Sequence, residues 1–213
     1  MTLRSFALLL ALALLPASAR GQSPALEVTL PVATSLGGEG PAVRSLNVLS
    51  ERKVRDLLRN GFPARLHFRA ELWTSGGPFN SRLRATEWYV VVRYDALRER
   101  YEAVRLLGDS VVQLGRFALL NEAVQEIERP YRPRIAGEKG HGRQYYNVTL
   151  ELEMMSVSDL DEVERWLRGE FRPAVRGERN PGTALGRGMR TLLVRLLGAE
   201  TRTIETRSKT FKP

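Results

Sequence analysis

The sequence predicts an α+β fold dominated by an antiparallel β-sheet or sandwich of about six strands, with about four helices of which one or more pack on a sheet face. Three observations predict it. Several segments alternate apolar and polar residues with a period of two, which is typical of strands with one buried face. Other segments space their apolar residues as amphipathic helices do, and some of the strands follow one another through short turns.

Residues 1–19 have the pattern of a secretory signal peptide. Arg4 lies near the start, an apolar run occupies 6–15, and small residues precede a cleavage site after Ala19 or after Gly21. The run is shorter than the roughly 20 residues of a transmembrane helix, and no later segment is apolar for long enough. The sequence therefore predicts an exported protein, periplasmic or associated with the cell envelope, whose mature chain has no transmembrane span.

Residues 20–48 are expected to be an N-terminal lead-in. Leu26, Val28 and Leu30 alternate as a first strand before a Gly-Gly-Glu-Gly-Pro break at 37–41. Residues 49–213 are expected to form a single β-rich globular domain, in which 172–213 supply a basic helix and a strand.

The domain is expected to begin with a helix that has Ser50 as its N-cap and ends at Asn60 and Gly61. Strict alternation at 64–73 then predicts a strand that buries its even-numbered residues. After a loop at 75–81, residues 84–94 predict a second strand, and residues 101–106 return antiparallel to it.

Helical spacing of Phe117, Leu120, Val124 and Ile127 predicts a second helix, which Pro130 ends. Residues 145–154 alternate strictly and predict a further strand. A third helix is expected from Ser158 to about residue 167, a fourth at 183–197, and a polar strand at about 201–211.

The chain has no cysteine and a strongly uneven distribution of charge. The absence of cysteine excludes disulfides, thiolate metal ligands and a lipidated cysteine, and in an exported chain of this length it is more typical of a bacterial envelope. The net charge is +9, and residues 172–213 contain 10 Lys and Arg against three Glu, a net of +7. Such a segment attracts nucleic acid, anionic lipid or acidic polymers, and export argues against nucleic acid. Alternatively, the charge is only solvating, since 29 of the 33 basic residues are arginine.

The predicted helix at 183–197 is basic and amphipathic. Its leucines and Met189 share one side, and Arg187, Arg190 and Arg195 lie on the other, where we expect them to contact an anionic partner. The same helix could equally cover one face of the sheet and direct its arginines into water.

Candidate groups for catalysis are few, and no metal site or cofactor is expected. His67 alternates onto the polar face of its strand as a surface residue, and His141 lies among three glycines that position it poorly. Glu151 and Glu153 share one face of a strand, so they could act as an acid and a base on a sugar, or simply be solvated.

Four segments resemble an exported bacterial family described as domain of unknown function 4390. They are LRNGFPARLHF at 58–68, the Tyr-Asp-Ala-Leu turn at 94–97 with Tyr101 after it, the Leu-x-Glu-Ala helix at 120–123, and the ending Arg-Ser-x-x-Phe at 207–211. The resemblance spans about 49–211 and implies export and a β-rich fold. The segment at 75–81 is less aromatic than the family pattern. No catalytic or ligand-binding residue is established for the family, so the resemblance implies none here.

These observations favour a non-enzymatic envelope protein that binds a partner protein, an anionic lipid surface or an amphiphilic ligand. Two alternatives remain. One is a hydrolase that acts on an envelope polymer through Glu151 and Glu153, and the other is a purely structural envelope module. The sequence does not determine the oligomeric state or the identity of the partner.

Overall fold

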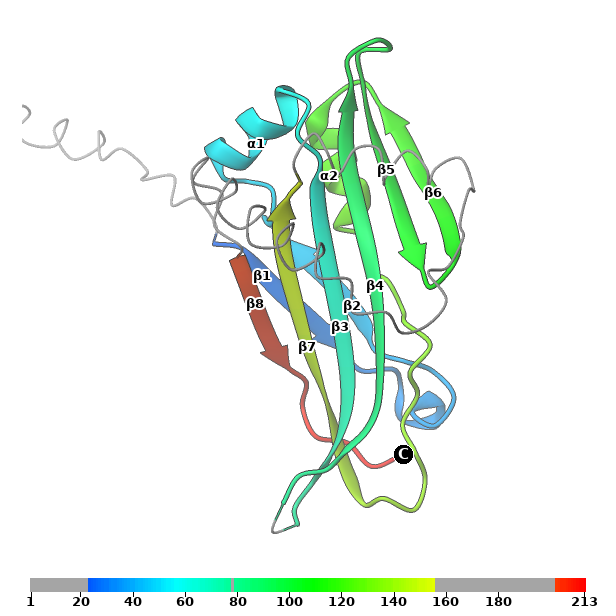
Figure 1. The fold of residues 1–213 in the computed structure, drawn as a ribbon. Coiled ribbons are helices and arrows are strands. Elements are labelled where there is room, and N and C mark those ends of the chain that lie inside the picture. The colour runs from blue at the N-terminus through cyan, green and yellow to red at the C-terminus, as the bar shows by residue number, and fades with distance from the viewer. Residues whose placement is uncertain (1–22, 78, 156–201) are drawn as a thin grey trace, which may run out of the picture.

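The computed structural model describes residues 23–77, 79–155 and 202–213. Its main element is a six-stranded antiparallel sheet with the strand order β6-β5-β4-β3-β7-β8 (Figure 1). The strands are β3 (Ala64–Ser75), β4 (Arg82–Asp95), β5 (Arg100–Leu107), β6 (Ser110–Phe117), β7 (Arg143–Met154) and β8 (Arg202–Arg207). The predicted α+β class with a dominant antiparallel sheet is confirmed.

Strand β3 is central because β4 and β7 pair with its two edges. Phe68 lies opposite Trp88 of β4 and opposite Leu150 of β7. All three side chains are buried, and the rings of Phe68 and Trp88 stack with their centroids 5.0 Å apart. The even-numbered residues of β3 and β7 therefore face the core, as the alternation predicts.

A second layer covers the core face of the sheet. It consists of the antiparallel pair β1 (Ala25–Thr29) and β2 (Ala42–Leu46), the short 3₁₀ helix η1 (Ala33–Ser35), and the helices α1 (Arg52–Arg59) and α2 (Leu120–Ile127). Leu26, Val43, Leu58 and Ile127 from this layer are buried in the same apolar cluster as the sheet residues. Each such side chain contributes about 1.5–3 kcal/mol of burial free energy.

The opposite face of the sheet has no covering helix or strand among the described residues, and we call it the open face. It presents the odd-numbered residues of β3 and β7 and their neighbours across the sheet. Near the Met154 end of β7, it also has a small apolar cluster of Val91, Val104, Leu106 and Met155.

Helix α1 starts differently from the prediction. The N-cap is Glu51, whose backbone is extended, and Ser50 instead donates its hydroxyl to the carbonyl of Asn47, 2.7 Å away. Ser50 as N-cap is therefore wrong, because a local turn at Asn47 (φ +55°) takes its hydroxyl. The predicted end is confirmed: Asn60 is the C-cap, and Gly61 has the left-handed φ of +86°.

Strands β2 and β6 are not predicted by the sequence pattern. β6 follows a tight turn at Gly108 (φ +56°), and its residues 110–113 are all exposed because it is an edge strand, so no buried alternation marks it. Phe117 belongs to β6 and not to α2, which begins at Leu120. The helices expected at 158–167 and 183–197 lie outside the described residues.

The C-terminal residues join β7 to the segment that follows α2. Phe211 bridges to Gln144, and its ring stacks on Tyr146 with centroids 5.2 Å apart. The Tyr146 hydroxyl donates to the carbonyl of Ile135 at 2.9 Å, and burial raises the pKa of Tyr146 to about 12. One buried side chain thus contacts two segments that are distant in the sequence.

Tyr146→Phe is expected to lower the free energy of unfolding by about 1 kcal/mol, because the buried carbonyl of Ile135 loses its donor. Chemical denaturation at neutral pH measures this loss. The phenol also sets a pH window: its contribution is complete below the ordinary tyrosine pKa of 10.0 and is lost as the pH rises through about 12. Tyr94→Phe, at a half-buried ring, is the control, and equal losses in both variants would contradict this role of the hydroxyl.

Candidate functional site

The open face is polar along its central strands. Because successive side chains of a strand point to opposite faces, the register that buries the apolar residues brings the polar ones together on this face. Strand β3 contributes Arg65, His67, Arg69, Glu71 and Trp73, and their partners on β7 are Glu153, Glu151, Thr149, Asn147 and Tyr145.

His67 lies between two carboxylates from the neighbouring strands. Its Nε2 is 3.2 Å from Glu87 Oε2 on β4, and its Nδ1 is 3.6 Å from Glu151 Oε2 on β7. The imidazole also stacks on Tyr89, with centroids 4.5 Å apart. His67 is therefore held by partners on both sides, which its position in the sequence alone does not indicate.

The two carboxylates that the sequence singles out both lie on the open face. Glu153 forms a direct ion pair with Arg65, and Glu151 faces the imidazole of His67. The side chain of Glu151 is 51% exposed and that of Glu153 is 32% exposed. Each carboxylate thus serves as a partner for a basic side chain of β3.

Glu71 is a carboxylate of this row with three side-chain partners. It accepts hydrogen bonds from Trp73 Nε1 at 3.1 Å and from Arg82 Nη1 at 3.0 Å, and it lies 2.9 Å from Arg69 Nη2. Burial alone would raise the pKa of Glu71, but the hydrogen bonds from Arg82 and Trp73 and the charge of Arg69 outweigh it and lower the pKa. Glu71 is therefore ionised at neutral pH.

Two adjoining hollows lie over β3, β7 and β8. One has a volume of about 330 Å³ and the other about 480 Å³, and Asn147 and Glu205 line both. The amide of Asn147 donates to Glu205 at 2.7 Å and so joins β7 to β8 at the boundary. The first hollow is also lined by His67, Arg69, Glu71, Thr149 and Glu151, and the second by Trp73, Tyr145, Thr206 and Arg207.

The second hollow has an aromatic lining. Trp73 and Tyr145 are direct partners across β3 and β7, and the guanidinium of Arg207 lies 3.3 Å from the centroid of the Tyr145 ring. The hydroxyl of Tyr145 accepts a hydrogen bond from the Asn80 amide at 3.4 Å. The hollows together therefore combine aromatic surface, amide groups and charges of both signs.

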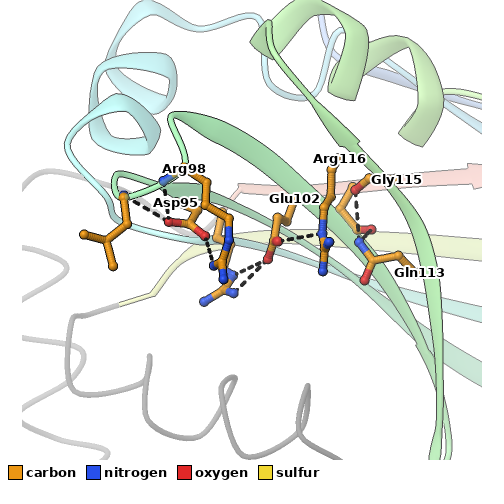
Figure 2. A network of polar contacts seen from close by, with 9 residues as sticks. Asp95, Arg98, Glu102, Gln113, Gly115 and Arg116 are labelled. Carbon is orange, nitrogen blue, oxygen red and sulfur yellow. Dashed lines mark hydrogen bonds and ion pairs between the residues drawn. The ribbon is translucent and has the colours of Figure 1, made fainter.

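A separate cluster of charges lies near the turn between β4 and β5 (Figure 2). Glu102 is only 6% exposed and accepts hydrogen bonds from Arg93 at 3.0 and 2.7 Å, and its other oxygen lies 3.0 Å from Arg116. Asp95 pairs with Arg98 at 2.8 Å and accepts from two backbone N–H groups of the turn, and these hydrogen bonds lower the pKa of Asp95. Both carboxylates are engaged within the cluster, so we assign it to holding β4, β5 and β6 together.

Two features do not occur in the described part of the chain. No group of three or more His, Asp or Glu side chains there is arranged to hold a metal ion. No helix in the same residues is long and apolar enough to cross a membrane.

The model of one protein family, described as "Domain of unknown function (DUF4390)", matches residues 44–164, more than half of the 213-residue chain. The chain belongs to this family. The matched range contains β3, β4 and β7 and therefore most of the open face, whereas β8 lies beyond it. No curated protein and no solved structure matches the chain.

The fold brings together residues that the sequence does not link. Strand β7 lies between β3 and β8, and this order brings together Trp73, Tyr145, Asn147, Glu205 and Arg207. Alternation places each of them on a polar face, but only the strand order makes them neighbours.

The expected anionic-contact residues Arg187, Arg190 and Arg195, and the expected cleavage site at Ala19, lie outside the described residues. His141 is exposed and lies 3.4 Å from Glu138.

Glu71→Gln is expected to destabilise the DUF4390 domain by about 1–2 kcal/mol at neutral pH, because charge-assisted hydrogen bonds from Arg82 and Trp73 are weakened. The lowered pKa means that this stabilisation is present above the ordinary value of 4.5 and is lost as the pH falls through the folded-state pKa. Denaturant unfolding at a series of acidic pH values should therefore show less acid sensitivity in the variant. Glu27→Gln, which removes one carboxylate of an exposed ion pair, is the control; equal acid sensitivity of Glu71→Gln and the parent chain would refute this role.

Proposed function

We propose that this protein is an exported, non-enzymatic binding protein of the bacterial cell envelope, and that the open face of its sheet binds a partner protein. The observation that most favours this is the pair of hollows that share Asn147 and Glu205 and receive side chains from three strands. A rigid sheet positions these side chains better than a loop would.

The types of residue in the hollows favour a protein as the partner. Trp, Tyr and Arg dominate binding energies at protein interfaces, and Trp73, Tyr145 and Arg207 gather at one end of the hollows. Along the rest of the surface, basic and acidic groups alternate, as with Arg69 beside Glu71. Such a mixed surface selects a partner with complementary charges and disfavours a uniformly charged polymer.

The positions of Glu151 and Glu153 give less support to the hydrolase alternative. An acid and a base of a glycosidase need environments that separate their pKa values. Both carboxylates of β7 instead lie on an accessible face, opposite the basic side chains Arg65 and His67 of β3. We therefore interpret them as part of the binding surface.

Replacing Thr149 by a photoreactive amino acid tests the proposed surface, because Thr149 lines the first hollow. In the native envelope we expect illumination to give one discrete crosslinked product at this position. The same amino acid at Lys53, exposed on α1 in the layer that covers the other face, is the control. Similar products from both positions, or none from Thr149, would count against the proposal and favour a purely structural role.

Once the crosslinked partner is identified, Trp73→Ala is expected to weaken its affinity for the purified chain by about tenfold or more, as for an interface anchor. Isothermal titration calorimetry measures the change. Thr203→Ala, at an exposed position of β8 outside the lining of both hollows, is the matched control. Equal affinity of the Trp73 variant and the parent chain would exclude this hollow as the binding site.

A double substitution, Glu151→Gln with Glu153→Gln, distinguishes the hydrolase alternative from the proposed binding function. Purified envelope polymer is incubated with the parent chain and with this variant, and soluble fragments are measured. We expect no fragments from either chain. Fragments from the parent chain that disappear in the variant would replace the binding proposal by catalysis.

A further inference from the structure

The described parts of three segments meet at one end of the molecule, and we call them the basic end: residues 75–77 with 79–84, 136–143 and 208–213. Ser75 pairs with Arg143 across β3 and β7, and Phe211 bridges to Gln144. Arg143 also donates to the Thr210 hydroxyl at 2.7 Å. Figure 1 shows the hairpin between β3 and β4, the turn before β7 and the C-terminal segment together at the lower end of the sheet.

The basic end has a large excess of positive charge. Its three segments contain six Lys and Arg side chains against a single Glu, and all six are exposed. The glutamate, Glu138, pairs with Arg84, and Arg82 pairs with Glu71. Within the described part of the chain, the four other cations have no carboxylate partner: Lys139, Arg143, Lys209 and Lys212.

An exposed aromatic ring lies at the tip of the same end. Phe79, in the hairpin between β3 and β4, is 85% exposed, although burial of such a side chain is strongly favourable. Leu97, at the turn between β4 and β5, is 96% exposed, but its neighbours Asp95, Arg98, Glu99 and Arg100 balance in charge. Unlike the turn at Leu97, the Phe79 end therefore combines an exposed apolar side chain with a net positive surface.

We propose that the basic end docks on an anionic lipid surface, with Phe79 inserted at the boundary of the headgroups and acyl chains and the four unpaired cations at the lipid phosphates. An apolar tip among cations matches the two layers of an anionic bilayer, apolar inside and negative at its surface. A soluble polyanion would use the cations and leave the ring in water. None of the residues proposed to contact lipid lines either hollow of the open face, so substitutions can test the two proposals independently.

Vesicle sedimentation of the full chain tests the lipid proposal. We expect binding to vesicles of phosphatidylglycerol with phosphatidylcholine, weaker binding at high salt, and little binding to phosphatidylcholine alone. Phe79→Ala should weaken the partition into anionic vesicles by about tenfold. The triple variant Lys139→Gln, Lys209→Gln, Lys212→Gln should weaken it by about tenfold or more.

Leu97→Ala is the matched control, because it removes an equally exposed apolar side chain at the other end of β4. All variants keep the same N-terminal and 156–201 segments, so their differences report on the basic end alone. Partition unchanged by Phe79→Ala would overturn the proposal, and a loss in the triple variant only would point to a soluble polyanion. No binding of the parent chain to anionic vesicles would also overturn it.

Discussion

The pairing register of β3 with β4 and β7 is the constraint on which the rest of the structure depends. Side chains alternate between the two faces of a strand, so a slip of one residue would move Phe68 and Leu150 out of the core and charged side chains into it. The apolar residues of the core face therefore fix the position of every polar residue on the open face. In this molecule, packing on one side determines the arrangement of the candidate site on the other.

Charge pairing on the open face follows from the same register. Arg65 faces Glu153, His67 lies between Glu87 and Glu151, and Glu71 accepts from Arg82 and Trp73. Opposite charges on neighbouring strands stabilise the sheet modestly where they are exposed. Their greater effect is to hold side chains in fixed positions, as the proposed binding surface requires.

The two surfaces proposed for contact differ in character. The hollows over β3, β7 and β8 are nearly balanced in charge and rigid, whereas the basic end is strongly positive and presents one aromatic ring at a hairpin tip. A protein with both could be held at a membrane by one end while its sheet face remains accessible. Because the surfaces share no cation, substitutions can separate their roles.

Sequence patterns predict the parts of the fold that are buried on one side only. Alternation in β3 and β7 predicts which residues are buried and places Glu151 and Glu153 on the polar face. It does not predict β6, an edge strand whose first four residues are all exposed, or the N-cap of α1, where Ser50 bonds to a local turn. It also does not place His67 beside Glu87 and Glu151, since those contacts depend on pairing between strands far apart in the sequence.

The register can be measured directly with paired cysteines, because the chain has none of its own. Arg69 and Thr149 are partners across β3 and β7 on the open face, whereas Val148 points to the core. The double variant Arg69→Cys, Thr149→Cys is expected to form an intramolecular disulfide under mild oxidation, and Arg69→Cys, Val148→Cys is not. A disulfide in the second variant and none in the first would mean that the strands pair in a different register, and the arrangement of the open face described above would be wrong.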